Sequence, residues 1–278
     1  MKGKRGKIRW GLWVSIGVWM SVFVLFAGGV GLWREYESRA WLGQERFTVV
    51  TQKSGEIAVE SIDPVARVGV RMRMPANLLI KTVGGRGEWE MAALPKLASK
   101  YSWEWVGDSI ADAMGIAYTA VETEMNWWDA IAWGRLKMGI ELTEVDLRRE
   151  RVVENVRLAD GEDVWRLTAE FDRKSKEWFG SAALGRIERG VRIINTTARS
   201  GLGLNAARSI ESAGLEVVEV SSVEEEVGEC EVKAKQDEIT SLGVQFLARS
   251  LRCRILVGED DDITVNLGRE YLEWLYGG

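Results

Sequence analysis

Residues 191–220 read VRIINTTARSGLGLNAARSIESAGLEVVEV and show the clearest folding pattern in this chain of 278 residues. The apolar run at 191–194 predicts a strand, 202–213 predicts a helix that ends at Gly214, and 215–220 predicts a second strand. The pattern continues to the end of the chain, with predicted strands at 230–234, 254–257 and 263–267 and predicted helices at 239–251 and 270–276. The order β-α-β-β-α-β-β-α predicts a small domain with a sheet covered by helices.

A GxGxxA match lies within this stretch at 201–206, and Glu219 ends the next predicted strand. This arrangement imitates the fingerprint of dinucleotide-binding proteins. In that fingerprint the first glycine directly follows the strand, whereas 195–200 intervene here. The region is also too small for a whole dinucleotide fold, so we interpret the glycines as a turn that caps the helix and expect no cofactor.

The same residues, together with the terminal DITVNLGREY, resemble the LytR C-terminal domain of bacterial envelope proteins over 191–273. The shared pattern is a strand, an Asn-led turn, a helix that starts with small residues, and a closing strand followed by Gly and Tyr. Thr196 stands where that turn usually has a small residue. The resemblance implies a non-catalytic accessory module that contacts the cell wall. The matching positions are Asn195, Thr196, Thr197, Gly201, Ala206, Gly214, Asp262, Ile263, Leu267, Gly268 and Tyr271.

The middle of the chain predicts a second α/β unit. Alternating segments at 47–50, 57–60 and 68–74 predict half-buried strands, and Gly84 to Gly87 predict a turn. Apolar residues at three- and four-residue steps predict a helix over 92–114, ended by Gly115. The rest predicts a strand at 116–121, a helix at 127–138, strands at 152–158 and 164–171, and a partly helical connection at 173–190.

Residues 47–140 resemble, more weakly, the LytR–CpsA–Psr family, whose members transfer glycopolymers from a polyprenyl-pyrophosphate carrier to the wall. The resemblance rests on IAVESIDP, VGVRMRMPANLLIKTVGG, LPKL and IADAMGIAYTAV. The family places an Arg-Asp pair after the proline that follows the strand, to bind pyrophosphate and Mg²⁺. Here Pro75 is followed by Ala76 and Asn77, which implies a degenerate copy.

Three arginines in this region form a candidate ligand site. The strand pattern places Arg67, Arg71 and Arg73 on one face, where guanidinium groups could bind the oxygens of a phosphate. The alternative is a solvated charged face without a ligand. A divergent enzyme would also need an acid recruited from elsewhere, such as Asp63 or Asp108.

Residues 10–33 form an uncharged run, WGLWVSIGVWMSVFVLFAGGVGLW, bracketed by Trp10 and Trp33. About 20 apolar residues cross a bilayer as a helix. The five basic residues within 1–9 predict a cytoplasmic N-terminus and an extracytoplasmic main chain. A cleaved signal peptide is the alternative, but its apolar part is shorter and ends at small residues. We therefore expect a single-pass signal anchor in the bacterial cell membrane.

Composition limits the chemistry of the predicted ectodomain. The chain carries a net charge of −5, and because the first nine residues contribute +5 and 10–33 contribute none, residues 34–278 carry −10. An acidic ectodomain is not expected to bind nucleic acid. The absence of histidine excludes a Ser-His-Asp triad and the usual catalytic zinc sites. We expect no metal, except Mg²⁺ if the middle region were an active transferase.

Cys230 and Cys253 are the only cysteines. In an oxidising compartment they could pair, and in the chain-entropy model a loop of this length stabilises a fold by roughly 3 kcal/mol. The alternative is two buried free thiols. The predicted neighbouring strands favour the disulfide.

The predicted organisation is therefore a mixed α/β (α+β) protein, and two functions remain open. The first is a non-catalytic envelope protein that binds or positions a wall polymer or an envelope protein through its C-terminal domain. The second is a divergent glycopolymer phosphotransferase. The expected segments are a basic tail at 1–9, the anchor at 10–33, a juxtamembrane stalk at 34–46, a degenerate LytR–CpsA–Psr-like domain at 47–180 and a LytR C-terminal-like domain at 181–278.

Overall fold

The computed structural model describes residues 19, 20, 23, 26, 29–31, 33–223 and 227–277. The predicted tail 1–9 lies outside these residues, as does most of the predicted anchor 10–33. Within the described part of the chain, no helix combines the length and the apolar character needed to cross a membrane. The anchor therefore stays a prediction.

The middle of the chain forms a mixed five-stranded sheet with the order β6-β1-β2-β3-β7. The three central strands are antiparallel neighbours, whereas β6 and β7 are parallel to the strands beside them. Thr48 to Val50 and Val59 to Asp63 are buried without interruption, because helices cover both faces of these strands. The strands are Phe47–Lys53 (β1), Glu56–Asp63 (β2), Val68–Arg73 (β3), Ala120–Val121 (β6) and Leu142–Val145 (β7).

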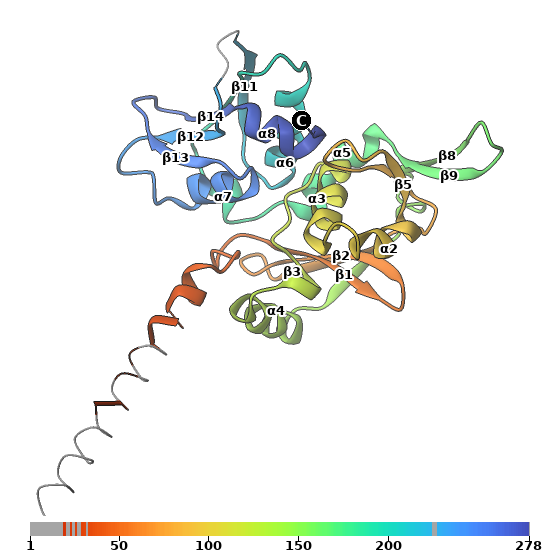
Figure 1. Ribbon diagram of the computed structural model, residues 1–278, viewed down its shortest axis with the longest axis horizontal. Coiled ribbons are helices and arrows are strands. Elements are labelled where there is room, and N and C mark those ends of the chain that lie inside the picture. Colours follow the sequence, from red (N-terminus) through yellow and green to blue (C-terminus); the bar gives the residue numbers. More distant parts are fainter. Residues whose placement is uncertain are drawn as a thin grey trace, which may run out of the picture.

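Different helices cover the two faces of this sheet (Figure 1). Phe47 and Ile62 are paired across β1 and β2 and pack with Trp133 of α4, Trp127–Gly139. Val50 and Val59 form another cross-strand pair and belong to the main core, together with Ile110 of α3, Trp103–Met114. The sheet therefore separates a small core under α4 from a large one under α3.

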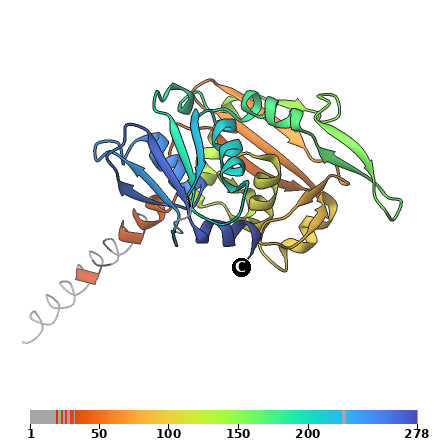
Figure 2. The same ribbon diagram turned by 90° about the horizontal axis from the view of Figure 1, so that it is seen from above.

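The C-terminal region forms a second five-stranded sheet, with the order β11-β10-β14-β12-β13, which lies beside the first one (Figure 2). The predicted order β-α-β-β-α-β-β-α is confirmed. The main core crosses from one sheet to the other and includes Met72, Met114, Ile210 and Val265. The elements are Val191–Asn195 (β10), Leu202–Ser212 (α6), Val217–Ser222 (β11), Glu231–Ala234 (β12), Leu242–Ser250 (α7), Arg254–Val257 (β13), Ile263–Leu267 (β14) and Arg269–Tyr276 (α8).

The remaining elements complete the middle region and lead into the C-terminal sheet. Two hairpins pair β4 with β5 and β8 with β9. Part of the helix α5 and a 3₁₀ turn lie within the predicted partly helical connection between the two regions. The bounds are Leu79–Lys81 (β4), Glu88–Glu90 (β5), Val153–Arg157 (β8), Asp163–Leu167 (β9) and Ala169–Phe179 (α5), with short 3₁₀ turns at Met91–Ala93, Glu122–Glu124 and Leu184–Arg186.

Three predicted elements of the middle region need correction. The predicted helix 92–114 is broken into α2, Leu94–Ala98, and α3, because Ser102 caps a new helix by accepting a hydrogen bond from the Trp105 amide at 3.0 Å. Its predicted end is confirmed, since Gly115 has the left-handed φ of 60°. The predicted strand 116–121 is reduced to the two residues of β6. The predicted strand 164–171 ends at Leu167, where α5 soon begins.

The segment 38–46, most of the expected stalk, packs against the folded part of the chain. The Asp129 carboxylate of α4 accepts hydrogen bonds from the Ala40 and Trp41 amides at 2.7 and 3.2 Å. From the other side, Arg249 of α7 donates to the Arg39 and Ala40 carbonyls at 3.1 and 2.9 Å. Trp41 also stacks on Phe47, with 5.1 Å between the ring centroids. The chain is thus held by α4 and α7 just before β1.

We predict that Ser102→Ala lowers the free energy of unfolding by about 1 kcal/mol, because the first turn of α3 loses its side-chain cap. Urea unfolding followed by far-UV circular dichroism measures this change. Ser99→Ala is the matched control, since the Ser99 hydroxyl only donates to the Lys96 carbonyl on the exposed end of α2. An equal loss in both variants would contradict the assigned cap.

Candidate functional site

The predicted arginine face of β3 is matched by acidic residues on both neighbouring strands. Arg71 lies opposite Glu60 of β2 and Glu144 of β7 in the sheet register. Its Nε is 2.7 Å from Glu60 Oε1, and its Nη1 is 3.3 Å from Glu144 Oε1. Arg73 reaches the other oxygen of Glu144, at 3.4 Å. The two arginines therefore lie in a network of cross-strand ion pairs.

Glu60 is the buried centre of this network. Lys137 of α4 binds its second oxygen at 2.6 Å, on the face of the sheet that α4 covers. Burial by itself raises the pKa of the Glu60 carboxyl, but hydrogen bonds and charge from Lys137 and Arg71 outweigh burial and lower it. Glu60 thus stays ionised, and Arg71 is held by a permanent counter-charge.

Arg67 lies apart from these two arginines. It belongs to the turn between β2 and β3, where its φ is 57° and its side chain is exposed. The prediction that all three arginines share one strand face is therefore wrong. The positive φ of the turn, which strand alternation does not reveal, separates Arg67 from the strand.

Asp63, one of the two acids considered for recruitment, holds that turn. Its Oδ1 accepts from the Val65 and Ala66 amides at 2.8 and 2.7 Å, and its Oδ2 accepts from the Ala182 amide at 2.6 Å. The Asp63 carboxylate is therefore bound by three backbone amides, and the residue is only 1% exposed.

The residues after β3 form a structural turn. The Asn77 side chain donates to the Asp163 carbonyl at 3.0 Å. The Asn77 backbone carbonyl accepts from the Trp165 amide, also at 3.0 Å. The exposed Ala76 offers no polar side-chain atom, and its carbonyl accepts from the Ala92 amide. The position where the resemblance places an Arg-Asp pair thus joins β3 to the hairpin of β8 and β9.

A groove of about 610 Å³ opens beside this turn. Met74, Pro75, Met91 and Leu147 supply apolar wall. Its charges are balanced, because three arginines and three acidic residues line it. They are Arg73, Arg148, Arg149, Glu56, Glu144 and Asp146.

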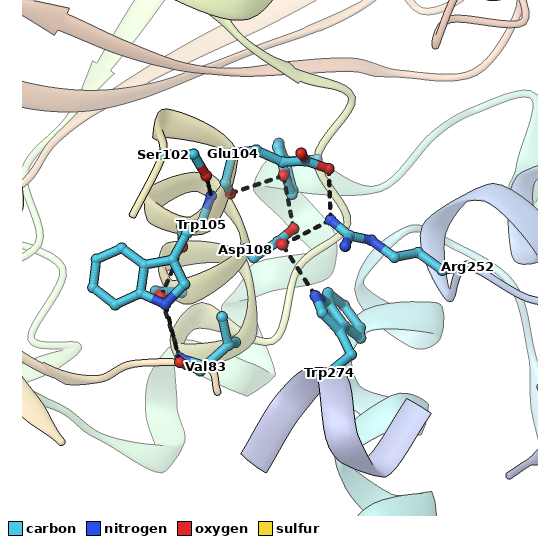
Figure 3. A network of polar contacts seen from close by, with 9 residues as sticks. Val83, Ser102, Glu104, Trp105, Asp108, Arg252 and Trp274 are labelled. Atoms are coloured by element: carbon cyan, nitrogen blue, oxygen red, sulfur yellow. Dashed lines mark hydrogen bonds and ion pairs between the residues drawn. The ribbon is translucent and has the colours of Figure 1, made fainter. Parts of the chain in front are cut away.

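Asp108 is the second acid considered for recruitment. It forms a polar centre between α3 and the C-terminal helices (Figure 3). Its Oδ1 accepts from the Tyr118 hydroxyl at 2.7 Å. Its Oδ2 accepts from Arg252 Nη2 at 2.7 Å and from Trp274 Nε1 at 3.0 Å. A buried carboxylate needs such donors to remain charged.

Arg252 strengthens the contact between the two regions. Its guanidinium also binds Glu104, one turn before Asp108, at 2.9 Å, and lies 4.7 Å from the ring centroid of Trp274. The two acids differ in exposure, because the Glu104 side chain is 63% exposed and that of Asp108 only 6%. The ion pair of Asp108 is therefore less screened by solvent than that of Glu104.

Asp112 continues the same acidic face of α3. It accepts a hydrogen bond from Asn205 Nδ2 of α6 at 2.6 Å, and burial raises its pKa above the ordinary 3.8. A cavity of about 180 Å³ lies beside Asp108 and Asp112, and Tyr118 and Tyr271 also line it. Burial raises the pKa of both tyrosines, which are therefore neutral hydroxyls at physiological pH.

The turn residues of the C-terminal motif bind one another. Asn195 Oδ1 accepts from the Thr197 amide and hydroxyl at 3.1 and 2.8 Å, and its Nδ2 donates to the Arg199 carbonyl at 2.8 Å. The Thr196 hydroxyl donates to the Leu267 carbonyl at 2.9 Å and accepts from the Val227 amide at 3.2 Å. These buried side chains tie the ends of β10 and β14 together.

The other motif residues also support the fold. Gly201 precedes α6 with a φ of 83°. A Cβ at Gly268 would collide with the carbonyl oxygens of Val227 and Glu229. Asp262 accepts from Arg192 of β10 at 3.3 Å. The motif residues therefore hold the strands and turns of the C-terminal sheet in place.

Cys230 and Cys253 form a disulfide, with their Cα atoms 4.5 Å apart. The bond links the residues that precede β12 and β13, which are parallel neighbours. It closes the loop that contains α7.

One signal for the polar centre was present in the sequence. Glu104, Asp108 and Asp112 recur every four residues, which places three acids on one face of the predicted helix. Their partners come from distant positions, so the pattern alone does not reveal them. In the described part of the chain, no three His, Cys, Asp or Glu residues are placed to hold a metal ion.

Comparisons with known proteins give neither a matching family model nor a matching curated protein. Among solved structures, the chain is similar to the Bacillus subtilis "transcriptional regulator yvhJ" (8% identity, TM-score 0.31, covering 47% of this chain and 94% of that one). It is also similar to B. subtilis TagT (9%, 0.25, 84% and 89%) and to the "LytR-CPS2A-psr family protein YwtF (TagT) with bound octaprenyl pyrophosphate lipid" (8%, 0.24, 83% and 87%). TM-scores this low do not establish a shared fold.

We predict that Asp108→Asn lowers the free energy of unfolding by about 2 kcal/mol, because Arg252 loses its buried counter-charge. Glu104→Gln is the matched control and should change it by less than about 0.5 kcal/mol, since that ion pair is exposed. Urea unfolding at neutral pH compares the variants. Equal losses would contradict the central role of Asp108.

Asp112→Asn should become more stabilising, relative to wild type, as the pH rises above 3.8. Because burial raises the folded-state pKa, the folded protein binds more protons than the unfolded chain between the two pKa values, so wild-type stability falls with rising pH there. The variant lacks this loss and retains an acceptor for Asn205. Unfolding free energies across pH 4 to 8 test this, and a pH-independent difference would contradict it.

Proposed function

We propose that this chain is a single-pass, membrane-anchored protein of the bacterial cell envelope that has no catalytic activity. Its extracytoplasmic part would bind or position a cell-wall polymer or an envelope protein through the C-terminal region 181–278. The anchor, the orientation and the two family resemblances come from the sequence. The structure adds which partners the candidate catalytic side chains bind within the chain.

The observation that carries this proposal is that internal partners already occupy the groups a phosphotransferase would need. Asp63 accepts three backbone hydrogen bonds, and Asp108 accepts from Tyr118, Arg252 and Trp274. Arg71 is bound to the buried Glu60. Phosphoryl transfer depends on charges that are free to position the phosphate and its metal, so a chain that uses these charges for folding is poorly equipped for the reaction.

The edge strand β11 offers a surface for the proposed binding role. It lies at one end of the C-terminal sheet and leaves one side without a strand partner among the described residues. Val218 and Val220 are exposed on it, and Val220 lies against Gly203, next to the exposed Leu204 of α6. Free strand edges with apolar side chains can bind an extended segment of a partner by strand addition.

The disulfide supports the proposed location. Structural disulfides persist in oxidising compartments and are rare in the cytosol. Cys230 and Cys253 are paired in a buried site, as expected for a protein that folds outside the cytoplasm.

The alternative function is a divergent LytR–CpsA–Psr-type phosphotransferase that requires Mg²⁺. It is favoured by the groove beside Pro75 and Ala76, whose apolar wall and three arginines suit an amphiphilic phosphate. The three acids in the same groove weaken this reading, because they cancel the attraction for an anion.

Catalysis is tested with the full-length protein in nanodiscs and a polyprenyl pyrophosphate as the probe. We expect no Mg²⁺-dependent release of phosphate from the wild type, because Ala76 and Asn77 stand where the resemblance places the Arg-Asp pair. The double variant Ala76→Arg, Asn77→Asp should bind the probe more tightly than the control Ala76→Gln, Asn77→Gln. Wild-type turnover that Arg73→Ala abolishes would instead establish the transferase.

The proposed orientation is tested separately by adding protease to intact spheroplasts. Digestion of residues 34–278 is expected, because the basic residues of the tail keep the N-terminus inside. Full protection of the chain would refute the extracytoplasmic location and the wall-binding role together.

A further inference from the structure

The helix α4 is apolar on both its inner and its outer face. Its inner residues Trp133 and Leu136 pack against the sheet around Phe47 and Ile62. Its outer residues Trp127, Ile131 and Met138 are 40%, 39% and 83% exposed. A surface helix normally carries polar and charged residues on the face that points away from the core. The outer face of α4 therefore lacks a partner within the described part of the chain.

The exposed residues follow the helical repeat. Trp127, Ile131 and Met138 lie on one stripe, with Gly134 and the exposed Arg135 between the last two. A Cβ at Gly134 would have no atom within 4 Å, so the middle of the stripe is open. Arg135 has no ion pair among the described residues, whereas Lys137 on the sheet side is bound to Glu60. The stripe thus combines apolar side chains with one free cation.

Hydrogen bonds hold the segment after the predicted anchor against the start of α4. Asn126, the N-cap of α4, donates from Nδ2 to the Glu35 carbonyl at 3.0 Å and to the Ser38 hydroxyl at 2.9 Å. One turn later, Asp129 accepts from the Ala40 and Trp41 amides. The position of α4 relative to the end of the anchor is therefore set by direct contacts.

Aromatic rings connect the same two segments. Trp33 and Tyr36 have ring centroids 6.5 Å apart, Tyr36 meets Trp128 edge-on at 5.6 Å, and Trp128 stacks on Trp127 at 3.9 Å. Tryptophan and tyrosine concentrate at membrane–water interfaces. This row of rings begins at the last residue of the predicted span and ends on the outer stripe of α4.

The described residues of the N-terminal segment that precede this row include large apolar side chains. Of its described residues, Trp19, Met20, Phe23 and Phe26 are all exposed. The segment leaves the folded part of the molecule on the side where α4 lies (Figure 1). The apolar stripe of α4 therefore lies on the side of the molecule from which the predicted anchor leaves.

We propose that α4 is an interfacial membrane helix whose outer stripe of Trp127, Ile131 and Met138 lies in the bilayer surface, with Arg135 binding lipid phosphate. This inference rests on the anchor assigned in the proposed function. Amphiphilic helices that lie in the plane of the interface use such a combination of tryptophan, aliphatic side chains and a cation. The occupant of this face is thus the outer leaflet of the membrane that holds the anchor.

The test uses full-length protein in nanodiscs of equal amounts of phosphatidylcholine and phosphatidylglycerol, with nitroxide-labelled lipid as the quencher. A fluorescent label is placed on Met138→Cys, Phe23→Cys or Val218→Cys in turn, and the described cysteines do not compete because both are in the disulfide. Phe23 reports the anchor. Val218 is an exposed control on β11, which lies at the opposite end of the molecule from α4 (Figure 1).

We expect several-fold quenching at positions 138 and 23 and none at 218. Position 138 is decisive because it lies about 15 Å along the helix from Trp128, so it reaches lipid only if the whole helix lies on the bilayer. Adding Ile131→Glu should reduce the quenching at 138 several-fold and leave that at 23 unchanged, whereas Leu204→Glu should alter neither.

Quenching at 23 but not at 138 would overturn the interfacial helix and leave the anchor intact. No quenching at 23 would refute the anchor and the inference that depends on it. A label at 138 that is protected from aqueous iodide, yet is not quenched by lipid, would identify a protein as the occupant and overturn the proposal.

Discussion

The fold depends on a single buried carboxylate, Asp108, which joins two parts of the chain that form separate sheets. Its donors come from the loop after α3, from the turn after α7 and from α8, so one side chain connects the middle region to two parts of the C-terminal region. A buried charge is stable only while its donors remain in place. The relative positions of α3, α8 and the turn after α7 are therefore fixed together.

This use of charge recurs across the molecule. Glu60 holds Arg71 and Lys137 between the sheet and α4, Asp63 holds a turn, and Asp129 holds the entering chain. Each of these acids is nearly buried and has two or three donors. Asp63 and Asp108, which the sequence presents as candidate acids for catalysis, thus serve as connections between elements.

The sequence predicts the C-terminal elements well, because small residues and glycines mark the ends of its helices and apolar runs mark its strands. It predicts the middle region less well. The apolar repeat continues through 99–102, so the cap at Ser102 does not interrupt the pattern, and three-residue strands such as β4 and β5 are too short to show alternation. The polar centre cannot be predicted from local sequence patterns, because Arg252 and Trp274 are 144 and 166 residues away from Asp108 in the sequence. The strand alternation places Arg67 with Arg71 and Arg73, because a positive φ in a turn leaves no periodic signal in the sequence.

The clamp on residues 39–41 has a mechanical consequence. Asp129 from the middle region and Arg249 from the C-terminal region grip the same short stretch of backbone from two sides. A force that pulls on the N-terminal segment would therefore act on both regions before it acts on β1. Residues 39–41 therefore leave the folded part of the chain in one fixed direction, whereas a free linker would allow many directions.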